Sequence, residues 1–212
     1  MTDFFSQYKH IYLVGIKGAG MTALAELLVG RGIRVTGSDT SEHFYTDEIL
    51  QRLQIVYAEH FAPSNMTNDV DLVVHSTAYK PDEHPEIVFA GEVGIPVLSY
   101  PEAVGKLTEE RLTLAVCGTH GKTTTSSLLA ETLRALGENP SAIIGSQIRQ
   151  WGGSALVGDG QIDAFALPVE LAGPAGADGH PDHPLIGRAG QLADRLSLVD
   201  HAGQRLSAGQ LL

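Results

Sequence analysis

The chain of 212 residues has a single cysteine, Cys117, so no disulfide can form within it. It carries only 14 lysines and arginines against 25 aspartates and glutamates, and the formal charge of −11 lacks the basic stripe that nucleic-acid binding requires. No apolar run reaches the length of a membrane span, and no charged and then apolar leader opens the chain. These absences favour a cytoplasmic protein that neither binds nucleic acid nor inserts into a membrane.

Strand and helix patterns alternate through the first hundred residues. Strands are expected at 11–16, 34–39, 55–58, 70–77 and 95–98, and helices at 19–31, 46–54, 85–93 and 101–107. Such alternation predicts an α/β fold with a parallel, Rossmann-like sheet and helices on both faces. We place this first domain at residues 1–108.

The turn after the first predicted strand is rich in glycine. Residues 15–21 read GIKGAGM, which is G-x-x-G-x-G and not the G-x-G-x-x-G of dinucleotide-binding enzymes. The wrong spacing disfavours an NAD-dependent oxidoreductase. The turn still presents glycine N–H groups and a helix N-terminus at the sheet edge, where a diphosphate would bind. The candidate residues are Gly18, Ala19, Gly20 and Met21.

Polar residues end two other predicted strands. Asp39, nineteen residues past Gly20, stands where such folds place a carboxylate on a ribose hydroxyl, with turn capping as the alternative role. Ser76 and Thr77 end the strand at 70–77 and are candidate phosphate donors. His60, in the loop after the third strand, is either a further donor or a solvated loop residue.

Residues 112–125, LTLAVCGTHGKTTT, carry the strongest functional signal. An apolar strand breaks into a glycine-bracketed loop, and an amphipathic helix follows, which is the context that a phosphate-binding loop requires. The loop is a variant of G-x-x-x-x-G-K-[ST], because Val116 takes the place of the first glycine. The alternative is a glycine-rich turn whose threonines cap a helix. Cys117, at the strand end, is expected to be a small buried residue rather than a reactive thiol.

The phosphate-binding interpretation assigns a role to each residue of this loop. Backbone N–H groups and the first helical turn would surround the phosphates, and Lys122 would add a positive charge. The hydroxyl of Thr123 would bind Mg²⁺. The expected ATP-binding residues are Gly118, Thr119, His120, Gly121, Lys122, Thr123 and Thr124.

Two nucleotide-type sites in one chain, GIKGAGM and then GTHGKTTT, resemble the Mur ligase family. The resemblance covers about residues 10–160. It is carried by GIKGAGMTALAE, GSD at 37–39, STA at 76–78, PDEHPEI at 81–87, GIPVLSYPEAVGKL at 94–107 and CGTHGKTTT at 117–125. It is strongest to the branch that attaches L-alanine to UDP-N-acetylmuramate, and the murein-peptide ligase branch shares most of these motifs.

The resemblance implies an ATP-dependent amide-bond former of peptidoglycan precursor synthesis. The γ-phosphate would pass to the lactyl carboxylate of UDP-N-acetylmuramate, and the amine of L-alanine would then attack the acyl phosphate. The cofactors implied are ATP and Mg²⁺, with Lys122 as the catalytic residue and Thr123 on the metal. Residues 1–108 would bind the UDP-sugar, and residues 109–161 would form part of the central ATP-binding domain.

The sequence departs from the family in three places. Lys17 replaces a glycine of many members, where it would either contact the diphosphate or lie in solvent. Residues 57–61, YAEHF, lack the usual glycine before the histidine, which weakens the case for His60. After Gly160 the family continues into an acidic Mg²⁺-binding cluster, whereas this chain reads QIDAFALPVELAGPAG, and Glu170 is left unassigned.

Residues 162–212 are rich in Ala, Gly, Pro and Leu and have no periodicity beyond a weak helical pattern at 189–199. We interpret them as an atypical tail of a truncated ligase, disordered or translated out of frame. An acidic motif in another reading frame after codon 160 would support this, and its absence would count against it. His180 and His183 lack the further ligands of a metal site.

Because the acidic Mg²⁺-binding cluster of the family is missing, a nucleotide-binding module without turnover is favoured over a complete enzyme for this polypeptide.

Overall fold

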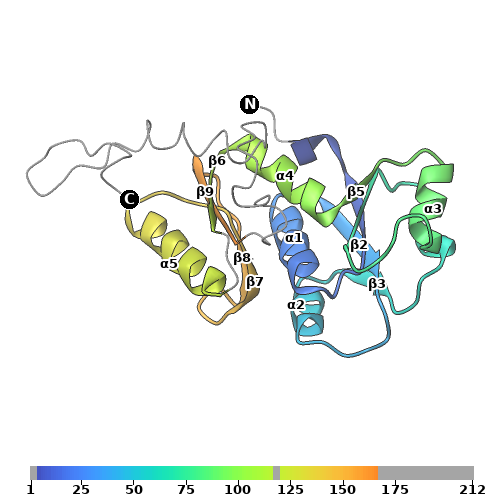
Figure 1. The fold of residues 1–212 in the computed structure, drawn as a ribbon, viewed down its shortest axis with the longest axis horizontal. Coiled ribbons are helices and arrows are strands. Elements are labelled where there is room, and N and C mark those ends of the chain that lie inside the picture. Colours follow the sequence, from blue (N-terminus) through green and yellow to red (C-terminus); the bar gives the residue numbers. More distant parts are fainter. Residues whose placement is uncertain (1–3, 117–119, 167–212) are drawn as a thin grey trace, which may run out of the picture. The chain divides into compact units, whose positions relative to one another are not determined.

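The computed structural model describes residues 4–116 and 120–166, which form two β-sheets and the helices packed on them (Figure 1). All of them belong to one contiguous unit, Met1–Ala166. The second unit, Leu167–Leu212, lies outside the described residues, and with it Glu170, His180, His183 and the predicted helix at 189–199.

The first sheet is parallel throughout, which confirms the predicted Rossmann-like fold. Its strands lie in the order β3-β2-β1-β4-β5. They are β1 (His10–Val14), β2 (Arg34–Ser38), β3 (Val56–Ala58), β4 (Leu72–His75) and β5 (Val97–Ser99). The chain moves outward from β1 in one direction through β2 and β3, and then in the other through β4 and β5. The carboxyl ends of β1 and β4 therefore form the switch point where ligands bind in open α/β sheets.

Helices pack on this sheet, and all but the last of them lie between its successive strands in the sequence (Figure 1). They are α1 (Ala19–Gly30), α2 (Thr46–Arg52), α3 (Pro85–Glu92) and α4 (Tyr100–Glu110), with short 3₁₀ turns η1 (Phe4–Gln7) and η2 (Pro63–Asn65). A capping box, in which Ser99 and Glu102 bond to each other's backbone N–H, begins α4. Residues 21–28 of α1 are all buried, because α1 packs on β2 and also on two strands of the second sheet.

The second sheet has the order β6-β9-β7-β8. Its strands are β6 (Leu112–Val116), β7 (Ala142–Ile148), β8 (Gly153–Leu156) and β9 (Ile162–Ala166), and α5 (Lys122–Ala135) packs on β6, β7 and β9. Strands β6, β9 and β7 are parallel, and β8 pairs with β7 in the antiparallel sense. This is the expected start of a phosphate-loop domain, with a strand, a glycine loop and a helix in succession.

Two strands of the second sheet were not predicted. Residues 162–166, assigned to the tail on composition, form β9 between β6 and β7. A buried aspartate, Asp163, interrupts its apolar pattern, and the carboxylate accepts the N–H of Ser141 at 2.9 Å. Strand β8, which forms a hairpin with β7, is also short and was not predicted.

The predicted domain limits stay predictions: the limit after residue 108 falls in the last turn of α4, and the limit after 161 falls just before β9.

No helix in the described ranges is long and apolar enough to cross a membrane.

Candidate nucleotide-binding sites

The first glycine turn joins β1 to α1 at the switch point. Gly15 has a φ of 81°, in the left-handed region that favours glycine, and its N–H donates to the Ser38 carbonyl at 2.8 Å. The helix N-cap, Gly18, has no side chain to bond the first-turn N–H groups, so those of Ala19 and Gly20 can face a ligand anion.

The four candidate residues of this turn differ in exposure. Gly18 is exposed, and Ala19 and Gly20 are half-buried. The side chain of Met21 is buried, with 3% of the residue exposed, so only its backbone N–H is suited to contact a diphosphate.

Two tyrosine rings lie close against the turn. A Cβ added at Gly15 would stand 2.8 Å from the ring of Tyr79, and one added at Gly20 would stand 2.8 Å from the ring of Tyr100. Burial raises the pKa of Tyr100 to about 12, so this phenol stays neutral. Packing therefore requires glycine at both positions, and at Gly15 the backbone conformation requires it as well. Sequence analysis missed both tyrosines.

Asp39 lies beside the turn with its carboxylate oxygens bonded to backbone. One oxygen accepts the N–H of Lys17 at 2.7 Å and the other accepts the N–H of Thr40 at 2.7 Å. The turn-capping role is thus present in the structure. The ribose-binding role stays a proposal, since each carboxylate oxygen has a second lone pair to offer.

Ser76 and Thr77 follow β4 at the same edge of the sheet. The N–H of Ser76 donates to the carbonyl of Val14, which places the serine next to the glycine turn. Its hydroxyl accepts the N–H of Ala78 at 3.3 Å and retains its own hydrogen for a phosphate oxygen. Thr77 is exposed. His60 is also exposed, and its backbone carbonyl accepts a hydrogen bond from the side-chain amide of Asn65 at 2.8 Å.

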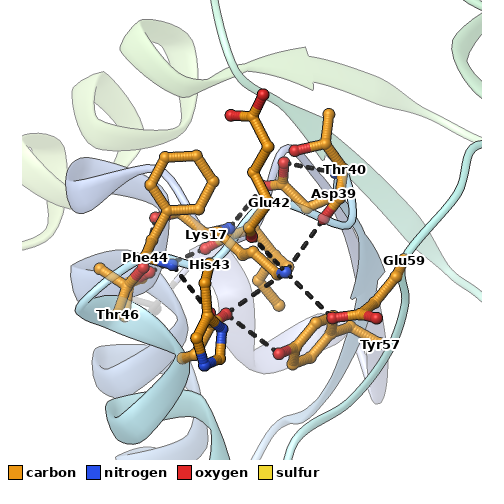
Figure 2. A network of polar contacts seen from close by, with 12 residues as sticks. Lys17, Asp39, Thr40, Glu42, His43, Phe44, Thr46, Tyr57 and Glu59 are labelled. Carbon is orange, nitrogen blue, oxygen red and sulfur yellow. Dashed lines mark hydrogen bonds and ion pairs between the residues drawn. The ribbon is translucent and has the colours of Figure 1, made fainter.

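Lys17 behaves differently from both expectations. Its side chain has no exposed surface, and its ammonium group points into a polar network between loops (Figure 2). The ammonium donates to the carbonyls of Thr40 and Glu42 at 2.9 Å each and to the carboxylate of Glu59 at 3.2 Å. The carboxylate of Asp47 lies 3.4 Å away. Its three hydrogens are all used, so Lys17 neither binds a diphosphate directly nor lies in solvent.

Glu86 is a second polar centre that sequence analysis missed. It is fully buried below the carboxyl edge of the first sheet. Its carboxylate accepts the hydroxyls of Tyr12 and Ser38, the N–H of Ala62 and the side-chain amide of Asn65. Four donors compensate the buried charge and tie β1, β2 and the loop before β4 together.

The second glycine loop leads into α5. Gly121, with a φ of 80°, is the N-cap residue, and Lys122 is the first residue of the helix. The N–H groups of Thr123 and Thr124, in the first turn, have no acceptor one turn earlier in the helix and are suited to an anion. His120, Gly121 and Thr124 are exposed, whereas Lys122 and Thr123 are half-buried. The predicted contacts Gly118 and Thr119 lie outside the described residues, as does Cys117.

Thr123 has a hydroxyl neighbour on the second sheet. Its Oγ1 lies 3.4 Å from the Oγ of Ser146 in β7. Mg²⁺ is commonly held by one or two protein oxygens together with water and substrate phosphates, and this pair fits one side of such a site. In residues 4–116 and 120–166 no cluster of three or more His, Cys, Asp or Glu side chains could hold a metal ion.

Known proteins with similar sequences are Mur ligases. A family model described as "Mur ligase family, catalytic domain" matches residues 10–111. The UDP-N-acetylmuramate–L-alanine ligase of Treponema pallidum (strain Nichols) is 43% identical over 160 residues, and that of Borreliella burgdorferi is 40% identical over 162 residues. The chain belongs to the Mur ligase family.

Solved Mur ligase structures agree with this assignment. A UDP-N-acetylmuramate-alanine ligase from Thermotoga maritima superimposes with a TM-score of 0.65 at 29% identity, covering 75% of this chain and 37% of that one. A UDP-N-acetylmuramate:L-alanyl-γ-D-glutamyl-meso-diaminopimelate ligase from Neisseria meningitides gives 0.65 at 28% identity, covering 76% and 52%.

The chain spans about a third of the length of the curated relatives that it matches. The matched regions are 76% of this chain and 33% of the Treponema protein, and 74% and 35% for the Borreliella protein.

Proposed function

We propose that this chain is a portion of a Mur ligase that joins L-alanine to UDP-N-acetylmuramate using ATP. The supporting observation is the pairing of two glycine loops, each following a strand and opening a helix, of which the second carries Lys122 and Thr123. The first loop would hold the UDP diphosphate and the second the triphosphate of ATP.

In the proposed first site the anion meets backbone rather than side-chain charge. The N–H groups at the start of α1 would face the diphosphate, and Asp39 would accept a ribose hydroxyl. Ser76 and Thr77 would donate to phosphate oxygens from the neighbouring strand. The rings of Tyr79 and Tyr100 would pack against this turn, where they leave no room for a side chain at Gly15 or Gly20.

In the proposed second site Lys122 is the catalytic residue. The lactyl carboxylate of UDP-N-acetylmuramate would attack the γ-phosphorus and ADP would leave, after which the alanine amine would displace phosphate from the acyl phosphate. Negative charge on the transferring group would be stabilised by the Lys122 ammonium and by the N–H groups of the loop. Thr123 would contribute a ligand to Mg²⁺, which neutralises phosphate charge when bound.

For this polypeptide itself we infer nucleotide binding without turnover. Rate enhancement requires the whole preorganised set of groups, and the described residues supply no acidic cluster for the metal. The measurement is phosphate release with UDP-N-acetylmuramate, L-alanine and Mg-ATP, run beside binding assays for each nucleotide. We expect binding without release. Release at an ordinary enzymatic rate would overturn the binding-only proposal, and absence of both binding events would overturn the ligase proposal.

The murein-peptide ligase branch is the alternative, since the Neisseria structure matches with the same TM-score as the Thermotoga structure. It would use a peptide in place of L-alanine, so a full-length protein carrying this segment would distinguish the two by its acceptor. A cytoplasmic setting, where ATP and the UDP-sugar are available, is part of the same proposal.

A further inference from the structure

The backbone and the side chain of Lys17 both bond to the segment that follows β2. The backbone N–H donates to the carboxylate of Asp39, and the backbone carbonyl accepts the hydroxyl of Thr46 at 2.6 Å. The ammonium donates to the backbone carbonyls of residues 40 and 42 (Figure 2). The hydrogen bond to Glu59 adds the loop after β3. We name this set of contacts the Lys17 latch, because it joins the glycine turn to residues 39–47 and to Glu59.

Within the latch the ammonium of Lys17 faces two carboxylates, those of Asp47 and Glu59. Burial alone would lower the pKa of Lys17, but the hydrogen bond to Glu59 and the charge of Asp47 outweigh it and raise that pKa. Burial likewise opposes ionisation of Asp47, yet its bonds from the Phe44 N–H and the Tyr57 hydroxyl, together with the Lys17 charge, lower its pKa. Lys17 is therefore an ammonium and Asp47 a carboxylate at neutral pH. The ring of Tyr57 lies 5.2 Å from the ammonium and completes the enclosure.

The latch connects the two anchors of the proposed UDP site. The residue after Lys17 is Gly18, where the diphosphate-facing turn of α1 begins, and Asp39 is the proposed ribose ligand at the end of β2. Without the ammonium, residues 40–45 would keep few bonds to the turn, and the spacing between phosphate anchor and ribose anchor would vary. A ligand that needs both anchors would then have to order the loop on binding.

We propose that Lys17 is a positioning residue for the UDP-sugar: the buried ammonium fixes the loop between β2 and α2 against the glycine turn before the ligand arrives. This inference rests on the proposed function, since it assumes that the first glycine turn binds a nucleoside diphosphate. It gives Lys17 no contact with the ligand, which separates it from Lys122.

The competing explanation is that Lys17 acts only through its positive charge. A substitution at Glu59 distinguishes this explanation from the positioning role. Its side chain is 57% exposed, so Glu59→Ala leaves the core untouched while removing one acceptor from the ammonium. If Lys17 acts only by attracting phosphate, loss of the neighbouring carboxylate should tighten UDP binding. If the latch positions the loop, the same substitution should weaken it. The two explanations predict opposite signs.

The experiment is calorimetric titration of UDP-N-acetylmuramate and, separately, Mg-ATP into the wild-type chain, Lys17→Met and Glu59→Ala. Glu109→Ala, which removes a carboxylate 51% exposed on α4, is the matched control. We expect UDP-N-acetylmuramate to bind about tenfold more weakly to Lys17→Met and about threefold more weakly to Glu59→Ala. Affinity for Mg-ATP should stay at the wild-type value in both, and Glu109→Ala should bind both ligands normally.

Each result has a separate meaning. If the folded wild-type chain does not bind UDP-N-acetylmuramate, the proposed function fails. If it binds, and Lys17→Met binds equally well, the positioning role fails while the proposed function stands. If Lys17→Met does not fold, Glu59→Ala decides: weaker binding supports the latch, and unchanged or tighter binding overturns it. Equal weakening of Mg-ATP would also overturn it, because the effect would then not belong to the UDP site.

Discussion

The carboxylate of Glu26 accepts the backbone N–H of Ser154 at 2.6 Å, which bonds helix α1 to strand β8 of the second sheet. Arg52 adds a hydrogen bond to the same carboxylate at 3.0 Å and another to the carbonyl of Gly152. Gly153 leaves no room for a Cβ against Glu26. Since α1 begins at the first glycine turn, one helix links the proposed UDP site to the sheet that carries the proposed phosphate loop.

Glu26→Ala should destabilise the protein by about 2 kcal/mol, because the N–H of Ser154 would stay buried without its acceptor. Urea unfolding followed by circular dichroism measures the change. Glu109→Ala, whose carboxylate is 51% exposed, serves as the control and should shift stability by less than about 0.5 kcal/mol. Equal stabilities for the two variants would show that the bond between α1 and β8 contributes nothing.

Stability should fall as the pH drops below about 6.5, and His84 should contribute to the fall. Burial lowers its pKa below the ordinary value, and neither ring nitrogen has a hydrogen-bond partner in the described part of the chain. The unfolded chain therefore takes up the proton first, so the folded state loses stability as the pH passes below the ordinary value of 6.5.

His84→Phe tests this dependence, since the ring packs edge-on against Phe61 at 4.6 Å and close to Tyr79 at 4.9 Å. Unfolding free energies measured between about pH 5.5 and about pH 7.5 should show a smaller slope in the variant. Burial also lowers the pKa of His10, which leaves part of the slope in place. An identical slope in wild type and variant would contradict the role of His84.

Gly37→Ala should prevent stable folding or destabilise by more than about 3 kcal/mol, because the new Cβ would collide with the backbone carbonyl oxygen of Leu13 in the adjacent strand. Gly105→Ala is the matched control within α4, where the added methyl meets open space. It should stabilise the protein by up to about 1 kcal/mol, through the better helix propensity of alanine. Thermal unfolding of both variants checks the contrast, and similar melting temperatures would contradict it.

The parallel sheet was predictable because several of its strands, β1 and β4 among them, are short apolar runs between turn signals. Strand β1, for example, is entirely buried, and its sequence HIYLV carries four apolar residues in succession. The two glycine turns were also predictable, because a turn with a positive φ favours glycine over every other residue. Gly15 and Gly121 both adopt such φ values.

The polar centres were not predictable from local pattern. Lys17 is exposed or buried according to loops that lie 23 to 42 residues further along the chain, and Glu26 bonds to Ser154, 128 residues away. A charged residue on a helix ordinarily indicates a face exposed to solvent, but in α1 the second sheet buries Glu26. Strand β9 was missed because Asp163 interrupts a short apolar run, and only its pairing with β6 and β7 stabilises it as a strand.

The most direct test of the central claim, that the loop before α5 holds a triphosphate, is titration of Mg-ATP and UDP-N-acetylmuramate into Lys122→Ala. Removing the ammonium should weaken Mg-ATP binding at least about tenfold and leave UDP-N-acetylmuramate binding unchanged. Lys106→Ala, which removes a lysine 39% exposed on α4, should bind both ligands like wild type. Unchanged Mg-ATP binding by Lys122→Ala, or an equal loss of both ligands, would contradict the account of two separate nucleotide sites.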